Sequence, residues 1–415
     1  MEQNRYPRRP CPVCRNESSN LLFEQSFAQL STTLMDGYSI VICPRCGAAF
    51  ADGIPPQAVF DAYYRDLSKY EDGGVFDAKE PPRVAQKFRD VAGTIGRFVP
   101  APDSRILEIG SASGALLKAL RDLGFPHVVG LDPSPGCVRA AKELYGITGL
   151  VGTVFTVANS GDTYDVLILT GVMEHIRDLD SAIDQFRLLL RKGGRVYLEV
   201  PDASRYEARL DAPFQEFSVE HINFFSRQSL VNLMQVRGFH AIDSGCVVRP
   251  LHEVTVPCTW GVFEYTGEAA AIQPDTETLP GLSGYIEGCK AEDARIRAAI
   301  DQALPLGERM IVWGAGTHTL RLLATHGLDP ARIALFVDSN PKYQHQQLRG
   351  VPIVGPDELR TRSEPILISS KSSQQAIRDQ IRIGLRLKNP LILLYGREDN
   401  TPQLDTAADG STSLE

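Results

Sequence analysis

Arg105 to Pro133 is the stretch that most restricts how this chain can fold. It opens with an apolar run, Ile106–Ile109, of the kind that forms a strand buried on both faces. A glycine turn (Gly110–Gly114) follows, then a helix pattern with leucines on one side, then a second strand, His127–Leu131, that ends in Asp132. The order strand, glycine turn, helix, strand and acid predicts a nucleotide-binding α/β unit.

The turn and the acid are the two parts of this unit that can contact a ligand. A glycine turn lets a ligand approach backbone N–H groups at a helix N-terminus, and the acid 22 residues after Gly110 can accept hydrogen bonds from a ribose diol. The spacing is G-x-x-x-G with Glu108 two residues ahead of it, and not the G-x-G-x-x-G of dinucleotide sites. The alternative is a Rossmann-like turn that binds nothing.

Length and charge limit the class of protein. A chain of 415 residues is too long for one hydrophobic core, so two or three domains are expected. A net charge of -8 and a pI near 5.6 argue against a nucleic-acid partner. No apolar run approaches the ~20 residues of a membrane span, and the N-terminal residues lack the apolar core of a signal peptide. We therefore expect a cytoplasmic protein with no membrane partner.

Four cysteines form two C-x-x-C pairs near the N-terminus, Cys11 with Cys14 and Cys43 with Cys46. Two such turns can close an all-sulfur tetrahedral shell around Zn²⁺, and a shell of four cysteines leaves no open position for catalysis. We predict a structural zinc ribbon, with reduced or redox-active cysteines as the alternative. The other four cysteines are scattered and are predicted to be buried apolar residues: Cys137, Cys246, Cys258 and Cys289.

After Asp132 the alternation of strands and helices continues, which predicts a mostly parallel sheet with helices on both faces. Ligands in such sheets lie beyond the carboxyl ends of the strands, where the glycine turn, Asp132 and the stretch Thr170–His175 fall. The further elements expected are helices over about 83–98, 135–145 and 180–190, strands over about 150–157, 164–169 and 195–200, and a turn over 192–194.

Two histidines are candidates for acid–base chemistry because histidine titrates near neutral pH. His175 follows the fourth strand of the unit, and His221 follows Glu220 in a stretch flanked by aromatic residues. A structural hydrogen bond in a loop is the alternative for either histidine. In the aromatic stretch 48–80, most residues are expected to pack a helix against a neighbour, and Tyr70 is the candidate to reach a ligand.

A second α/β unit follows nearer the C-terminus. Met310–Trp313 predicts a strand, Gly314–Gly316 a turn, Leu320–Leu323 part of a helix and Ala334–Val337 the next strand. It ends in Asp338, 24 residues after the first glycine, as the first unit ends in an acid. This unit is expected to be either a packing scaffold or a lid that helps to hold a nucleotide-sugar.

Four blocks, LEIGSASG, LILTGVMEHIRDL, LRKGGRVYLEVPD and EHINFFSRQSL…RGF, resemble successive motifs of class I S-adenosylmethionine (SAM)-dependent methyltransferases. With CPVC…CPRCG ahead of them, the chain resembles the zinc-binding sugar C-methyltransferase family. Ala112 stands where the methyltransferase motif has a glycine, and Ser218 where the sugar enzymes carry a tyrosine. The resemblance implies SAM as cofactor, held by Glu108, Gly110, Ser111, Gly114, Asp132, Pro133 and Thr170.

We therefore predict an α/β protein: a Rossmann-like class I methyltransferase domain with an N-terminal zinc ribbon and a second C-terminal Rossmann-like α/β domain. The predicted parts are a zinc-ribbon and substrate-lid region (1–80), a SAM-binding methyltransferase domain (81–260), a linker and connecting helix (261–305), a C-terminal Rossmann-like domain (306–400) and a disordered tail (401–415).

The resemblance also implies a reaction. The expected substrate is a nucleotide-linked keto-deoxysugar, methylated at carbon through an enolate. His221, oriented by Glu220, is the candidate base, and His175 would position the keto oxygen or stabilise its charge. An O- or N-methyltransferase acting on a sugar or small metabolite, and a non-catalytic SAM-fold binding protein, are the alternatives. The oligomeric state has no signature in the sequence.

Overall fold

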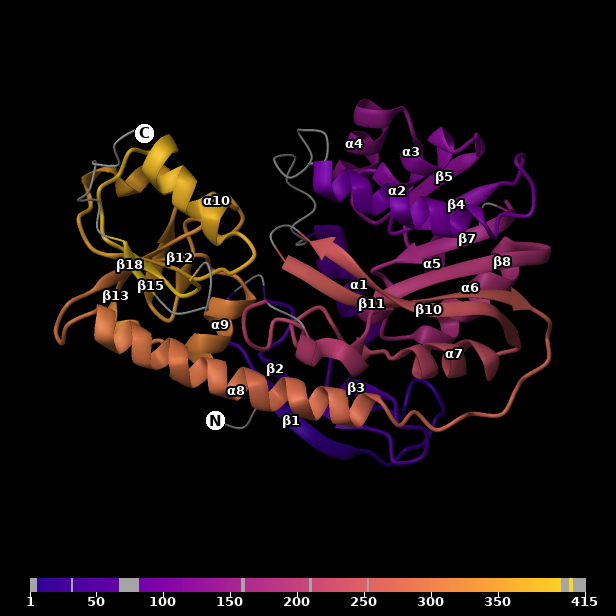
Figure 1. Cartoon of the computed structure of the whole chain (residues 1–415), viewed down its shortest axis with the longest axis horizontal. Coiled ribbons are helices and arrows are strands. Elements are labelled where there is room, and N and C mark those ends of the chain that lie inside the picture. The colour runs from indigo at the N-terminus through magenta and orange to yellow at the C-terminus, as the bar shows by residue number, and fades with distance from the viewer. Residues whose placement is uncertain are drawn as a thin grey trace, which may run out of the picture.

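Three β-sheets organise the chain in its computed structural model (Figure 1). The structure describes residues 6–30, 33–66, 82–157, 161–208, 211–251, 254–396 and 403–405. One sheet has four strands and the other two have seven strands each. In Figure 1 the central sheet runs from purple through magenta to salmon, the C-terminal sheet is orange to yellow, and α8 (Thr278–Ala303) runs along the lower edge between them.

The four-stranded sheet is antiparallel and lies at the N-terminus. Its strands β1 (Asn20–Ser26), β2 (Gly37–Ile42) and β3 (Ala49–Asp52) are consecutive in the chain. Its fourth strand, β9 (Asn223–Phe224), comes from far along the chain and pairs with β3. Because β9 follows His221 directly, the N-terminal sheet fixes where that histidine lies.

The central sheet has the strand order β10-β11-β8-β7-β4-β5-β6. The five strands from β8 to β6 are mutually parallel, and β11 is antiparallel to both of its neighbours. The predicted mostly parallel sheet is confirmed. Its strands are β4 (Ile106–Ile109), β5 (Val128–Asp132), β6 (Thr148–Val151), β7 (Tyr164–Thr170), β8 (Leu190–Pro201), β10 (Phe239–Leu251) and β11 (Val254–Tyr265).

Helices cover both faces of this sheet, because successive side chains of a strand point to opposite sides. Ile106 of β4 packs with the side chains of α2 and α3, whereas Leu107 and Ile109 pack with α6 and α7. Figure 1 shows α2, α3 and α4 above the sheet and α7 below it. The bounds are α2 (Pro82–Gly96), α3 (Ala115–Asp122), α4 (Pro135–Tyr145), α6 (Leu179–Leu189) and α7 (Arg227–Gln235).

Two expected elements of this unit differ from the structure. The strand expected over 150–157 ends at Val151, and Val154–Val157 forms a short helix, α5. The Thr153 hydroxyl accepts from the backbone N–H of Phe155 at 3.3 Å, a local bond that favours a helix start. The turn expected over 192–194 lies inside the continuous strand β8, where it forms an irregularity in the pairing with β7.

The C-terminal sheet confirms the predicted second α/β unit. The strands β15, β13, β12, β16 and β17 are parallel, with β14 and β18 antiparallel at the two edges. Helix α9 (Thr317–Ala324) follows the glycine turn. The strands are β12 (Met310–Trp313), β13 (Ile333–Val337), β14 (Gln347–Leu348), β15 (Val351–Val354), β16 (Ile366–Ile368), β17 (Leu391–Leu393) and β18 (Gln403–Asp405), and the last helix is α10 (Gln374–Asp379).

Two expectations about the connections and one about a cysteine are wrong. The linker expected from residue 261 starts later, because β11 continues to Tyr265. The tail expected to be disordered contains β18, which pairs with β17. Cys246 is exposed and not buried, since it lies on the edge strand β10. Within the described ranges we find no helix that combines the length and the apolar character needed to cross a membrane.

Candidate cofactor and acceptor site

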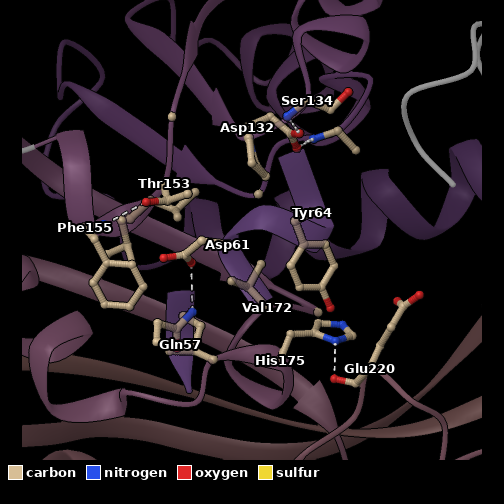
Figure 2. A pocket seen from close by; sticks show the side chains of 18 of the residues that line it. Gln57, Asp61, Tyr64, Asp132, Ser134, Thr153, Phe155, Val172, His175 and Glu220 are labelled. Atoms are coloured by element: carbon tan, nitrogen blue, oxygen red, sulfur yellow. Dashed lines mark hydrogen bonds between the residues drawn. The ribbon is translucent and has the colours of Figure 1, made fainter. Parts of the chain in front are cut away.

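The glycine turn after β4 is held by the carboxylate of Asp132, at the end of the neighbouring strand β5. Asp132 accepts from the backbone N–H of Ala112 at 2.8 Å and of Ser134 at 2.9 Å (Figure 2). Gly110 has a φ of +76°, and a Cβ built there would lie 2.5 Å from Cγ2 of Val172. Only glycine fits this position, as the turn motif predicts.

A cavity opens beside this turn at the carboxyl ends of the parallel strands (Figure 2). Four of the predicted cofactor-binding residues line it: Gly110, Asp132, Pro133 and Thr170. The other three lie behind its wall. Gly114 caps the start of α3, Ser111 is buried against Gly130, and Glu108 is buried within β4.

Glu108 supports the fit of a cationic ligand group to this cavity. Its side chain is buried, and its Oε2 has no hydrogen-bond partner among the described residues. Burial raises the pKa of Glu108 well above its usual range, Asp132 raises it further, and a hydrogen bond with Thr170 opposes both. A positive group at this end of the cavity would stabilise both carboxylates, as the ammonium group of the methionine part of SAM could do.

The wall opposite the turn comes from the N-terminal part of the chain. Gln57, Asp61 and Tyr64 of α1 (Gln57–Asp66) line the cavity together with Phe155. Gln57 accepts from the backbone N–H groups of residues 177 and 178, both at 2.9 Å, which joins α1 to the His175 loop. These residues were not predicted as site residues, and aromatic packing was the only signal that the α1 segment carried. The predicted Tyr70 lies outside the described residues.

His175 lies at the rim of the cavity and His221 lies against it. The ring of His175 lines the cavity, and its Nδ1 lies 2.9 Å from the backbone carbonyl oxygen of Glu220 (Figure 2). The two imidazole rings meet edge to face with centroids 4.9 Å apart. Burial lowers the pKa of His175, an effect that Glu174 partly opposes. The structure thus brings together the two histidines predicted from the sequence, although they are 46 positions apart.

The carboxylates around these histidines differ in part from the expected arrangement. The carboxylate of Glu220 accepts from the Tyr63 hydroxyl at 3.0 Å, whereas Nδ1 of His221 lies 3.5 Å from Oε2 of Glu216. Glu216 was not predicted as a site residue. The signal for it in the sequence is a carboxylate between aromatic residues, in the stretch Phe214 to Phe217.

Two buried polar side chains hold the histidine loops together. Asn223 donates to the backbone carbonyls of Met173 and Ile176, at 2.9 and 2.7 Å. Arg9 donates to the carbonyl of Ile222 at 2.6 Å and to the amide oxygen of Asn223 at 3.0 Å. The N-terminal segment therefore positions both histidine loops, a role not predicted from the sequence.

Glu174, His175 and His221 have candidate metal-ligand atoms within 4.8 Å of one another. The Nε2 of His175 and the Oε1 of Glu174 are 4.0 Å apart. Two ligands of one ion at usual bond lengths of about 2.1 Å would have to lie almost opposite each other at that separation. The spacing favours acid–base chemistry over metal binding for these residues.

The four predicted zinc ligands converge at the N-terminal sheet. The sulfur atoms of Cys11 and Cys46 are 3.6 Å apart and those of Cys14 and Cys43 are 3.5 Å apart, and all four residues are buried. Four sulfurs at about 2.3 Å from a tetrahedral zinc ion would be separated by about 3.8 Å, so the cluster fits this ion. Burial raises the pKa of Cys14 to about 11, and this thiol has to lose its proton when it binds zinc.

A family model described as a methyltransferase domain matches residues 83–244. The curated relatives include the ubiquinone biosynthesis O-methyltransferases of Mesorhizobium japonicum (strain LMG 29417 / CECT 9101 / MAFF 303099) and Chelativorans sp. (strain BNC1). They are 32% and 30% identical over 128 residues, which is 28% of this chain and 51% and 50% of the relatives. The chain thus spans about half the length of the curated relatives it matches.

A solved structure of a SAM-dependent methyltransferase from Anabaena variabilis ATCC 29413 is 19% identical, with a TM-score of 0.39 over 51% of this chain and 96% of that one. The assignment rests on the family model and on the central sheet, which has five parallel strands in the order β6-β5-β4-β7-β8 followed by the antiparallel β11. The chain therefore contains, over residues 83–244, a methyltransferase domain with the Rossmann-like α/β fold of class I SAM-dependent methyltransferases.

Proposed function

We propose that this protein is a SAM-dependent methyltransferase that methylates a carbon of a nucleotide-linked keto-deoxysugar. The observation that carries the proposal is the contact between His175 and His221 at the rim of the cofactor cavity, backed by buried carboxylates. The zinc cluster ahead of the methyltransferase domain and the α/β unit behind it support the sugar substrate through the resemblance noted in the sequence.

SAM supplies an electrophilic methyl group, so the protein has to hold an electron-rich atom of the substrate in line with that group. For a carbon acceptor, a base must remove the proton next to the ketone, and His221 takes that proton. His175, at the rim, holds the keto oxygen and stabilises the negative charge that develops on it. Because Nδ1 of His175 donates to the Glu220 carbonyl, the ring must also carry a proton on Nε2 to donate to the keto oxygen. Burial opposes this charged form of His175, whereas Glu174 favours it. The proton on His221 then leaves to water after methyl transfer.

Methylation of oxygen is the second candidate, and the curated relatives favour it. Both relatives described above are named as O-methyltransferases, and they match within the methyltransferase domain. In that reaction the same histidine pair would deprotonate a hydroxyl group. The acceptor atom, and not the cofactor, separates the two proposals.

The acceptor atom can be read from the product. Purified protein is incubated with SAM labelled with ¹³C in the methyl group and with a panel of nucleotide-linked 4-keto-6-deoxyhexoses. We expect a new ¹³C signal at the chemical shift of a methyl group on carbon. A signal at the shift of a methoxy group would overturn the carbon proposal in favour of the oxygen one.

The cofactor site can be tested separately through Asp132. Asp132→Ala removes the carboxylate proposed to accept the ribose hydroxyls and also frees the N–H groups of the turn. Unpaired polar groups typically cost ~1–3 kcal/mol, so the Kd for SAM should rise about 5- to 150-fold in calorimetry. Asp338→Ala, the corresponding acid of the C-terminal unit, is the matched control and should leave the Kd unchanged.

Unchanged SAM affinity in Asp132→Ala would place the ribose-binding acid elsewhere. Absence of SAM binding by the unaltered protein would favour the third alternative, a binding protein that has lost the cofactor.

A further inference from the structure

Glu216 is a fully buried carboxylate that faces a histidine. Its side chain has no exposed surface, and its Oε2 lies 3.5 Å from Nδ1 of His221. A carboxylate that is buried away from solvent is stabilised by hydrogen-bond donors or cations around it. The contact with Glu216 therefore favours a proton on Nδ1 of His221. The other ring nitrogen, Nε2, then keeps its lone pair and can accept a proton.

The other charged and titratable groups near His221 have different contacts. Glu220 accepts from Tyr63, and His175 meets the His221 ring edge to face and contacts the Glu220 backbone. Glu174 is paired with His175 at 4.0 Å. Glu216 is therefore the carboxylate best placed to stabilise the His221 tautomer that is protonated at Nδ1.

Helix α8 of the C-terminal part of the chain holds the backbone of Glu216. The N–H of Glu216 donates to the hydroxyl oxygen of Tyr285 at 3.1 Å. The ring of Phe217, the next residue, packs edge to face on Tyr285 with centroids 5.2 Å apart. Tyr285 thus contacts the Glu216 segment by one polar and one aromatic interaction.

The start of the same segment is fixed by the same helix and by α9. The N–H of Phe214 contacts the sulfur of Cys289 at 3.1 Å, and the guanidinium of Arg321 lies 5.0 Å from the centre of the Phe214 ring. Arg321 is in turn held by two hydrogen bonds of 2.6 Å to Asp293 of α8, in a buried pair. The segment that carries Glu216 is therefore packed on α8 at both ends, and on α9 of the C-terminal unit at its start.

We propose that Glu216 is a positioning residue that sets the tautomer of His221, and that helix α8, which leads into the C-terminal α/β unit, keeps Glu216 in place through Tyr285. The role in catalysis rests on the proposed function of His221 as the base. The proposal gives α8 a part in the reaction that does not require the C-terminal unit to bind any ligand.

The tautomer can be measured without substrate. Zinc-loaded full-length protein labelled with ¹⁵N in its histidine rings is studied by ring ¹⁵N–¹H correlation at mildly alkaline pH, and the His221 signals are assigned with His221→Gln. We expect the unaltered protein to show His221 protonated at Nδ1. Glu216→Gln should lose this preference, because a carboxamide can present either a donor or an acceptor to the ring.

Tyr285→Phe should also populate the second tautomer, since it frees the Glu216 segment at a distance from the histidine. Glu220→Gln is the matched control, because it neutralises the neighbouring carboxylate and should leave the His221 tautomer unchanged. Circular dichroism and zinc content establish that each variant is folded, and Glu216→Leu, which also removes the carboxylate, serves if Glu216→Gln is not. A single Nδ1–H tautomer in both Tyr285→Phe and the folded Glu216 variant would overturn the proposal.

A second measurement connects the tautomer to the reaction. With a nucleotide-linked 4-keto-6-deoxyhexose in D₂O, Glu216→Gln should slow exchange of the proton next to the ketone by ~10²–10⁴-fold with little change in KM. If Glu216→Gln changes the tautomer of His221 but exchanges the proton at the rate of the unaltered protein, Glu216 has no role in catalysis and that part of the proposal is overturned. No exchange by the unaltered protein would instead count against the proposed function, while the tautomer result still decides the role of Glu216.

Discussion

One zinc ion per chain is expected in protein purified without a chelator, and removing it should unfold the N-terminal sheet. The four cysteine sulfurs already lie close to the spacing of a tetrahedral site. Structural zinc contributes ~10–16 kcal/mol in small zinc-binding units, more than the total stability of a typical domain. Cys43→Ser removes one ligand and should produce a loss of zinc in elemental analysis, together with a large fall in thermal stability.

The fold indicates how far this loss should spread. Arg237 of the central unit donates to the carbonyls of Pro12 and Val13, and Arg9 binds the strand that follows His221. Loss of zinc should therefore impair the histidine pair, while SAM affinity changes little because the glycine turn lies in the central sheet. Cys246→Ser, an exposed cysteine on β10, is the matched control and should retain the metal. Unaltered protein that keeps its full stability after dialysis against a chelator has removed the metal would contradict a structural role for zinc.

His221→Ala is expected to abolish removal of the proton next to the ketone. That step does not need methyl transfer, so it can be followed in D₂O with S-adenosylhomocysteine in place of SAM and a nucleotide-linked 4-keto-6-deoxyhexose. A positioned base typically accelerates such a step by ~10²–10⁴-fold, and the variant should lose about that factor in the rate of deuterium incorporation. SAM affinity should survive, because His221 does not line the cofactor cavity.

Two outcomes separate the roles of the two histidines. Exchange that is lost in His221→Ala and reduced in His175→Ala agrees with a base and an oxygen-binding partner. Exchange that persists in His221→Ala but disappears in His175→Ala would make His175 the base. His240→Ala is the matched control, because His240 is an exposed histidine on β10 and should exchange at the unaltered rate.

Much of the fold could be predicted because its signals are local. The apolar run Ile106–Ile109, the turn at Gly110 and the acid at Asp132 lie within 27 residues, and each element forms from its own periodicity or backbone requirement. The same reasoning applies to the second unit from Met310 to Asp338. The sequence-based prediction is wrong where an apolar run suits either a strand or a helix, as at 150–157. There the hydroxyl of Thr153 accepts a hydrogen bond from the N–H of Phe155, and a helix starts.

The cysteine cluster and the two histidines could also be predicted from the sequence. Paired C-x-x-C spacing describes the ligand shell directly, and histidines after strand ends are recognisable by position. The four cysteines do converge, and His175 does contact His221. Their chemical roles stay predictions, since geometry gives proximity and not reactivity.

The arrangement around the histidines was decided by the tertiary structure alone. The sequence by itself determined the α/β units, the cofactor turn and the cysteine cluster, because those features are encoded by residues close together in the chain. The groups that surround His221 come from distant parts of the chain. Strand β9 pairs with the N-terminal sheet, the Tyr63 hydroxyl donates to the Glu220 carboxylate, and the N–H of Glu216 donates to the hydroxyl of Tyr285. Such contacts join residues separated by 69 to 175 positions, and they form only because burial of polar groups demands partners that no local pattern specifies.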